Sequence, residues 1–407
     1  MINLFFVLHD HLGARTYANE LLSYFSGIKS IRIYKVFLSS IHYKEYKIIS
    51  IDGITEIHLP AVLVPHMNLE KYSERCLDLM DPLLVGKENL IFHLNYATQV
   101  KLGIKARERY GSKLIYTLHF LPDYFSYVEN ERINELQKRV DVLELDMVRE
   151  ADRVICVTRF AQNTIRQLCQ VPEDKIVAIH NGCGEIDNIE PTSDLQKNAL
   201  KRFLGFDEEE QLILFVGSLE ERKGLKYLTK AFNTLSKHYT QVRLVIVGSG
   251  NFADVFDHAK GCWGKITLTG KITQAEVYVL YQIAAMGVIP SIYEQCSYVA
   301  LEMMKYGLPV VVASAPGLSE LYTNGENALV VPLFKGDIDL MKLELNEEKL
   351  AEALAMVLND KTLQQKLSKN VRSRWEQSYT AENMGDATIV QYKKLLTKKE
   401  SISKNNI

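Results

Sequence analysis

The chain has 407 residues, of which 47% are hydrophobic and 24% are charged, and its formal net charge is −2. Because one domain typically has ~100–200 residues, two domains with separate cores are expected. The balanced charge gives no support for broad electrostatic binding to nucleic acid or anionic lipid. The six cysteines are scattered without a C-x-x-C pair, which argues against a zinc site or a disulfide framework and favours a reducing compartment.

In the first half, short runs of β-branched and aromatic residues alternate with longer amphipathic segments, as in βαβ units around a parallel sheet. Residues 126–150 are predicted to form a long charged helix, with Ser126 and Glu129 spaced as in a capping box. The predicted strands are 3–8, 31–39, 55–60, 89–95, 113–119, 153–158 and 175–181.

The polar stretch 183–210 is predicted to connect the domains and to contain one helix, because it combines acids, glycines and a proline. A second α/β series follows, and the chain is helical from about 345 to 396. Its predicted strands are 211–218, 242–250, 265–270, 286–292, 309–314 and 327–331. The predicted divisions are 1–190 for a first domain, 191–375 for a second domain, 376–396 for a helix that returns to the first domain, and 397–407 for a disordered tail.

The expected location is the cytoplasm. The first apolar run is too short for a signal peptide, and no run of about 18 apolar residues occurs. Segment 101–113 has five basic residues and one opposing acid, but it lacks the bulky apolar face of an interfacial helix. A solvated helix face is the simpler interpretation, and a weak peripheral contact with the cytoplasmic face of the inner membrane stays open.

Two carboxylates mark the stretch 291–309. Glu302 lies inside an apolar run, and Glu294 lies in the preceding loop. Ser297 is the predicted N-cap of a helix over 298–306, whose first turn offers backbone N–H groups to a phosphate. A carboxylate in an apolar run needs hydrogen-bond partners, which a ligand's hydroxyls can supply. The alternative is that Glu302 bonds a neighbouring group and Glu294 is a solvated loop acid.

A cationic pair lies in the stretch 215–232. Arg222 and Lys223 follow a predicted strand and precede a helix that begins near Gly224. A guanidinium fork beside a point charge suits a diphosphate. The alternative is a solvated basic turn.

Together these stretches resemble the retaining GT-B glycosyltransferases of family 4 (glycosyl transferases group 1). That family carries two glutamates as E-x7-E, the spacing of Glu294 and Glu302, and "FVGSLEERKG" and "PGLSELYTNGENALVV" resemble the segments around them. In the first half, "VICVTRFAQNTI" and "IHNGC" match. The resemblance is dense over 212–332. It implies an α/β fold of two doubly wound, Rossmann-like domains facing across a cleft, with 1–190 binding the acceptor and 191–375 binding the nucleotide-sugar donor.

The resemblance also implies roles for individual residues. Arg222 and Lys223 would neutralise the diphosphate of a nucleotide-sugar donor, Glu302 would bind the ribose hydroxyls, and Glu294 would contact the transferred sugar. The other donor-side positions share the loops around these four. They are Ser218, Lys271, Ile272, Ser297, Tyr298 and Val299, of which Lys271 and Ile272 would form a wall against the base.

Three further positions come from the N-terminal half. His119 matches a family histidine that faces the donor sugar, with a structural loop histidine as the alternative. Gly13 is the single glycine in a loop that is usually glycine-rich in the family, so the acceptor side departs from the family pattern. Arg15 is a candidate phosphate contact that replaces backbone donors there.

The resemblance implies a retaining transferase that moves a sugar from a UDP- or GDP-linked donor to a sugar, lipid-linked or peptide acceptor, as in bacterial surface polysaccharide or glycoconjugate synthesis. No metal or other cofactor is expected. "HDH" at 9–11 and "DID" at 337–339 are interpreted as loops rather than metal sites. The alternatives are a nucleotide-sugar epimerase of the same fold and a non-catalytic nucleotide-sugar-binding partner.

Overall fold

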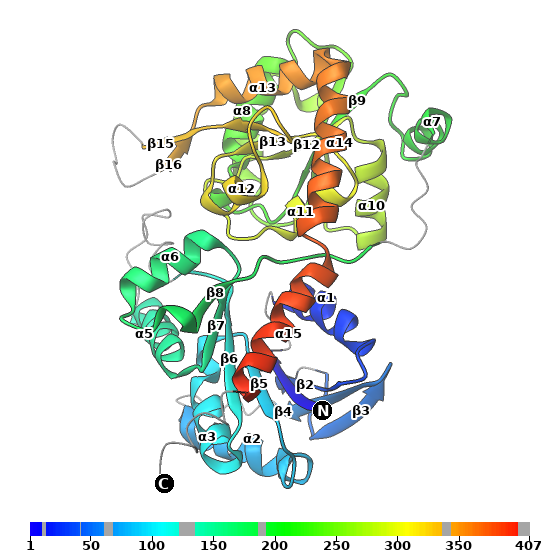
Figure 1. Cartoon of the computed structure of the whole chain (residues 1–407). Helices are drawn as coiled ribbons and strands as arrows, with labels where there is room; N and C mark the ends of the chain where they lie inside the picture. Colours follow the sequence, from blue (N-terminus) through cyan, green and yellow to red (C-terminus); the bar gives the residue numbers. More distant parts are fainter. Residues whose placement is uncertain are drawn as a thin grey trace. The chain divides into compact units, whose positions relative to one another are not determined.

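The computed structural model describes residues 1–9, 14–40, 42–60, 68–121, 135–185, 193–335 and 343–397 (Figure 1). Contacts within the chain divide it into two compact units. The first unit contains residues 1–124, 132–182 and 381–407, and the second contains 125–131 and 183–380. In the described part of the chain, no helix is long and apolar enough to cross a membrane.

The first unit is built on an eight-stranded sheet whose order is β3-β4-β2-β1-β5-β6-β7-β8. All neighbouring strands are parallel except β3 and β4. Each of the seven predicted strands is present. The bounds are β1 (Ile2–His9), β2 (Ile31–Ser40), β3 (Lys47–Ile51), β4 (Ile54–Pro60), β5 (Leu90–Leu94), β6 (Lys113–Leu118), β7 (Arg153–Cys156) and β8 (Ile176–Ala178).

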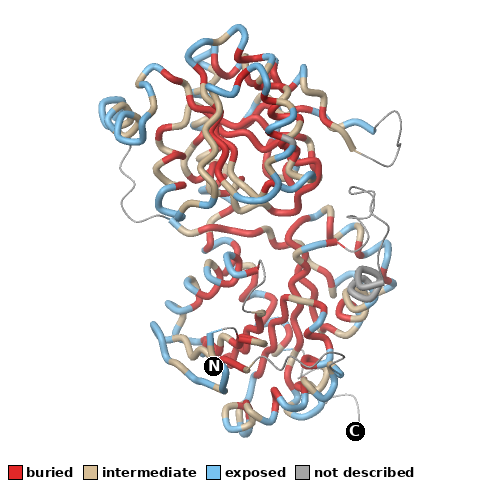
Figure 2. The backbone as a smooth tube through the Cα atoms, turned by 180° about the vertical axis from the view of Figure 1, so that it is seen from behind, coloured by how far each residue is buried: buried red, intermediate tan, exposed pale blue. Residues whose placement is uncertain are grey.

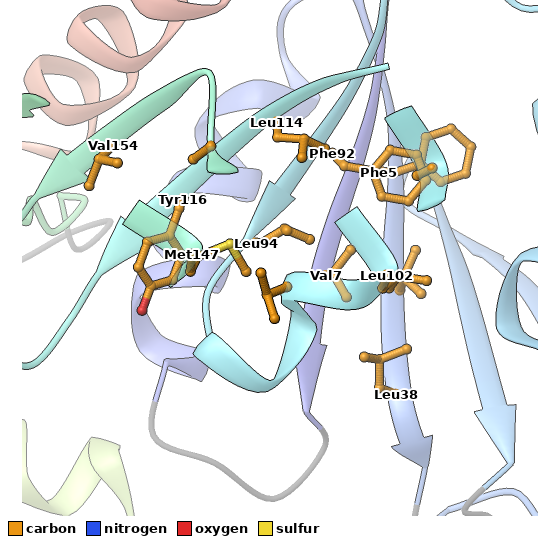
Figure 3. Packing of buried hydrophobic residues seen from close by; sticks show 14 of the residues in the cluster. Phe5, Val7, Leu38, Phe92, Leu94, Leu102, Leu114, Tyr116, Met147 and Val154 are labelled. Atoms are coloured by element: carbon orange, nitrogen blue, oxygen red, sulfur yellow. The ribbon is translucent and has the colours of Figure 1, made fainter. Parts of the chain in front are cut away.

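Helices cover both faces of this sheet. Because side chains alternate along a strand, Phe5 and Val7 of β1 face one core while Phe6 faces the other. Figure 3 shows the first core, where the Phe5 ring stacks on Phe92 at a centroid distance of 5.1 Å, with Tyr116 and Met147 in the same cluster. The helices are α1 (Arg15–Ser26), α2 (Leu69–Leu84), α3 (Val100–Tyr110), α5 (Glu135–Glu150), α6 (Arg159–Leu168) and α15 (Ala381–Thr397).

Helix α15 belongs to the first unit although it is the last helix of the chain. The fully buried Tyr392 places its hydroxyl 2.6 Å from Nδ1 of His93 on β5. The Tyr24 hydroxyl donates to Asp386 at 2.6 Å, and Gly385 lies so close to Tyr24 that an added Cβ would come within 2.1 Å of its ring. The last helix is therefore part of the core formed by the N-terminal half.

The second unit has a six-stranded parallel sheet of order β11-β10-β9-β12-β13-β14. Figure 2 shows the central strands of both sheets as buried segments. The strands are β9 (Gln211–Val216), β10 (Val242–Val247), β11 (Ile266–Gly270), β12 (Met286–Ile289), β13 (Val310–Ala313) and β14 (Leu329–Val331). The helices are α7 (Asp194–Phe203), α8 (Leu225–Leu235), α9 (Ala253–His258), α10 (Gln274–Ile283), α11 (Tyr298–Lys305), α12 (Pro316–Leu321), α13 (Glu347–Asn359) and α14 (Lys361–Ser378). All six strands were predicted.

Strand order reverses between β9 and β12. From β9 the chain adds β10 and β11 on one side, then returns to add β12, β13 and β14 on the other. In doubly wound sheets, ligands bind outside the carboxyl ends of the strands at such a reversal. The loops after β9 and β12, residues 217–224 and 290–297, are therefore where a site is expected.

Several predictions concern residues that the structure does not describe. The capping box of Ser126 and Glu129, the "DID" loop and the tail after 397 lie outside the described residues, and so do residues 10 and 11 of "HDH". Four of the five basic side chains in segment 101–113 form ion pairs. Lys105 contacts Glu70 and Glu74, Arg107 contacts Glu150, Arg109 contacts Asp78, and Lys113 contacts Asp152.

Candidate active site

The loops after β9 and β12 pack backbone against backbone. The Ile292 amide donates to the Arg222 carbonyl at 2.9 Å. Gly224 has a φ of +71°, and a Cβ added there would stand 2.0 Å from the Pro290 carbonyl oxygen. Only glycine fits this position, because it tolerates the left-handed conformation and leaves room for the neighbouring chain. The close approach brings Arg222 and Lys223 to the loop that carries Glu294.

Lys223 and Glu294 form an ion pair at this junction. The Lys223 Nζ contacts both carboxylate oxygens of Glu294, Oε2 at 3.0 Å. Only 6% of the Glu294 side chain and 17% of the Lys223 side chain are exposed. The Arg222 Nη1 lies 3.9 Å from Glu294 Oε2. Two cations and one carboxylate thus converge at the carboxyl end of the sheet.

Glu220 holds the guanidinium of Arg222. The Arg222 Nε donates to Glu220 Oε2 at 2.6 Å. Burial alone would raise the pKa of Glu220, but a hydrogen bond from Ser218 and the charge of Arg222 outweigh it, so its pKa lies below the usual value. The result is a chain of contacts from Ser218 through Glu220 and Arg222 to Glu294.

The Glu302 carboxylate is hydrogen-bonded on both oxygens. Gln274 Nε2 donates to Oε1 at 2.8 Å, and the Tyr281 hydroxyl donates to Oε2 at 2.8 Å. Both partners belong to α10, and the Tyr281 side chain is buried. Neighbouring groups therefore satisfy Glu302, and each oxygen keeps further capacity to accept a hydrogen bond from a ligand.

Helix α11 begins as predicted. Ser297 is its N-cap, and its Oγ accepts from the Ala300 amide at 3.4 Å. Tyr298 and Val299 form the first turn, where an α-helix does not use its own backbone N–H groups and its dipole favours an anion. Directly before the helix, the Gly317 amide of α12 donates to the Glu294 carbonyl at 3.1 Å and fixes the loop.

The loop after β11 approaches the same helix. Thr273 caps α10, and Gln274, its first residue, contacts Glu302. Lys271, which is exposed, and Ile272, which is partly buried, directly precede this cap. That the backbone around Lys271 and Ile272 forms a wall against the base stays a prediction.

The remaining predicted residues belong to the first unit. His119 follows β6, and its Nε2 lies 3.1 Å from Asn95 Oδ1. Burial lowers its pKa to about 4, so the ring is neutral near pH 7. Arg15 is exposed at the start of α1. Gly13 lies outside the described residues.

Three residues of this site were not identified from the sequence. They are Glu220, Gln274 and Tyr281. Gln274 and Tyr281 are separated from Glu302 by 28 and 21 residues, so only the packing of α10 against α11 brings them together. Glu220 did carry a signal, since it stands two residues before Arg222 in a loop.

Within the residues that the structure describes, no group of three or more histidine, cysteine, aspartate or glutamate side chains is arranged to hold a metal ion. All six cysteines are buried, and none of them forms a disulfide in the part of the chain that the structure describes. Near Glu294 the positive charge comes from Arg222 and Lys223, and the start of α11 adds the positive end of a helix dipole to the second unit.

Two family models match the chain. The model for glycosyl transferases group 1 matches residues 196–374, and the model for glycosyltransferase family 4 matches residues 86–183. An uncharacterised glycosyltransferase of Methanocaldococcus jannaschii is 29% identical over 259 residues, and the α-D-kanosaminyltransferase of Streptomyces kanamyceticus is 23% identical over 255 residues. These matches cover 63% and 62% of this chain, and 63% of the length of each relative.

Solved structures share the whole fold. Sucrose-phosphate synthase from Thermosynechococcus elongatus superposes with a TM-score of 0.75 at 18% identity, covering 98% of this chain and 100% of that one. HepE from Anabaena, in complex with UDP, gives a TM-score of 0.72 at 18% identity, covering 97% and 100%. Two parallel Rossmann-like sheets with these neighbours confirm the predicted GT-B fold.

Proposed function

We propose that this chain, which the two family matches indicate to be a GT-B glycosyltransferase of group 1, moves a sugar from a nucleoside diphosphate sugar to an acceptor with retention of configuration. The observation that carries this proposal is the convergence of Lys223, Arg222 and Glu294 at the strand-order reversal. A diphosphate needs concentrated positive charge beside backbone donors, and this junction offers both.

In the proposed complex, the diphosphate takes over Lys223 and Arg222 and rests on the first turn of α11. Glu294, released from Lys223, accepts hydrogen bonds from hydroxyls of the transferred sugar and supports the positive charge that develops at its anomeric carbon. Glu302, held by Gln274 and Tyr281, binds the ribose hydroxyls. UDP is a reasonable first donor nucleotide, because the structural neighbour HepE was solved with UDP and with UDP-glucose.

Retention can follow from front-side attack. The departing phosphate oxygen then takes the proton of the acceptor hydroxyl, which attacks the same face of the sugar. No separate protein nucleophile enters this scheme, so the catalytic contribution is positioning and stabilisation of the leaving diphosphate. His119 of the first unit, neutral near pH 7, would hydrogen-bond the donor sugar, and Arg15 would contact the acceptor side.

The acceptor class that fits this proposal is a sugar, a lipid-linked sugar or a peptide in glycoconjugate or surface polysaccharide synthesis. The first unit would bind it, at the loops after the parallel strands. The reaction would take place in the cytoplasm or at the cytoplasmic face of the inner membrane, and the proposal includes no metal.

A donor panel tests the function. UDP, GDP and their hexose conjugates are titrated calorimetrically, and the sugar of the tightest ligand is then followed by NMR with and without acceptor extracts. We expect one conjugate to bind, and slow release of its sugar as the retained anomer. Isomerised sugar would favour the epimerase, and binding without turnover in acceptor extracts would favour a non-catalytic partner.

Matched variants locate the activity. Lys223→Ala should cost at least ~2 kcal/mol in transition-state stabilisation, because the leaving diphosphate loses its nearest cation. Lys226→Ala is the control, since Lys226 lies three residues further on and contacts Glu221 instead. Equal turnover in Lys223→Ala and the control would remove this site assignment.

A further inference from the structure

A second hollow lies in the second unit at the opposite edge of its sheet. It has a volume of about 490 Å³, within the ~300–1,000 Å³ of small-molecule sites. Ala285 and Pro309 line it just before β12 and β13 begin, whereas the candidate active site lies where strands end. Its walls come from α7, the end of α10, the loop after α11, and α14. The proposed function leaves this cavity unused.

Four of the polar side chains that line the cavity are available to a ligand. Asp194 and Lys197 of α7 and Gln365 and Ser368 of α14 line it. Within the described residues, none of these four side chains makes a hydrogen bond or an ion pair. Together they offer an ammonium, a carboxylate, an amide and a hydroxyl, which is a mixed set of donors and acceptors.

The charge and the apolar part of the lining narrow the ligand class. Lys197 and Asp194 balance, so neither an anion nor a cation is favoured over a neutral molecule. The rings of Tyr281 and Tyr306 line the same cavity with their centroids 5.3 Å apart. Of the two rings, that of Tyr306 is partly exposed and suits the C–H face of a sugar ring, while the amide and hydroxyl groups suit its hydroxyls. A phosphate would meet Asp194 without a second cation to offset it.

The cavity is joined to the candidate active site by one side chain. Tyr281 lines the cavity, and its hydroxyl donates to Glu302 Oε2 at 2.8 Å. Because Tyr281 is buried, a ligand that shifts its ring also shifts this hydrogen bond. We propose that the cavity binds a neutral saccharide of one or two rings, and that its occupancy changes nucleotide affinity through Tyr281 and Glu302.

Binding is tested on the full chain without nucleotide. Maltose is titrated and followed by saturation-transfer NMR, with glucose as the one-ring probe. We expect binding that Gln365→Trp abolishes, because the indole fills the hollow. Lys369→Trp, on the same helix but outside the lining, should retain it. Equal maltose binding by both variants, or no binding of either sugar to the wild type, would overturn the proposal.

Competition distinguishes the cavity from the donor site. Saturating UDP should leave maltose bound, since the two ligands occupy opposite edges of the sheet. Displacement of maltose by UDP, with binding unaffected by Gln365→Trp, would place the sugar in the donor site and refute the cavity. The saccharide site of this proposal does not depend on the proposed function. If the wild-type protein bound maltose but no nucleotide, that result would contradict the glycosyltransferase function and leave the saccharide site standing.

The coupling rests on the proposed role of Glu302. With maltose present, the Kd for UDP should change at least threefold in the wild type and stay unchanged in Tyr281→Phe, which keeps the ring and loses the hydroxyl. An equal response of both proteins would refute transmission through Tyr281. Circular dichroism of each variant verifies that its fold is kept.

Discussion

Substitution of the Lys223–Glu294 pair tests the central contact of the candidate site. At 3.0 Å and an effective dielectric constant of ~20, two unit charges attract by about 5 kcal/mol, most of which desolvation offsets. Lys223→Met leaves a buried carboxylate with only Arg222 at 3.9 Å, so we expect a loss of about 3 kcal/mol in unfolding free energy. Glu294→Gln should cost less, because the Lys223 side chain is 17% exposed and water can reach it.

The double variant gives the coupling energy. Its loss should be smaller than the two single losses together by about 1–3 kcal/mol. Urea unfolding is followed by tryptophan fluorescence, since both tryptophans, Trp263 and Trp375, lie in the second unit. The exposed pair of Lys230 and Glu347, at 3.6 Å, is the control and should couple by less than ~1 kcal/mol. Single losses at Lys223 and Glu294 that simply add would refute the ion pair.

Four further outcomes are expected. Gly224→Ala should lower the unfolding free energy of the second unit by more than Gly205→Ala. Both glycines have a positive φ, but of the two only Gly224 would place an added Cβ against a carbonyl oxygen, at 2.0 Å. Equal losses in urea unfolding would contradict the close packing. Tyr281→Phe should weaken UDP binding by about 1 kcal/mol in calorimetry, through loss of one hydrogen bond to the Glu302 carboxylate, and an unchanged Kd would remove that contact from the site. His93 should show no NMR titration between pH 8 and about 4.5, because burial lowers its pKa to about 3. In the unfolded chain His93 takes up a proton below pH ~6.5, so the unfolding free energy of the first unit falls as the pH drops from 6.5 toward 3. A titration of His93 near pH 6.5 would contradict its burial. Dialysis against EDTA should leave sugar transfer unchanged, and activity restored only by added metal would refute the metal-free mechanism.

Most of the parallel strands were predictable because each is a short apolar run that is buried on both faces, as in β1, β5 and β13. The strands missed are of another kind. β3 is the edge strand of the sheet, and every one of its residues is exposed or only partly buried. Its sequence, KIISI, is rich in isoleucine but does not alternate apolar and polar residues, so it carries no clear strand pattern. The short antiparallel pair β15 (Leu333–Lys335) and β16 (Leu343–Leu345) also went unpredicted, since three-residue strands carry little periodicity.

In the candidate site, too, some features could be predicted from the sequence and others could not. Arg222, Lys223, Glu294 and the start of α11 were predictable, because each follows a strand in a loop of recognisable composition. The pairing of Lys223 with Glu294 spans 71 residues and depends on the adjacency of β9 and β12, which the sequence does not state. The Glu302 partners on α10 likewise come from tertiary packing.

The position of α15 has a consequence for how the protein is made. Domains generally fold as units during synthesis, N-terminal first. Here the first unit lacks Tyr392 and its bond to His93 until residue 392 leaves the ribosome, whereas residues 183–380 are complete before then. The half that is translated first is thus the half that finishes folding last, and a premature stop codon near 380 would damage the N-terminal half rather than the segment next to it.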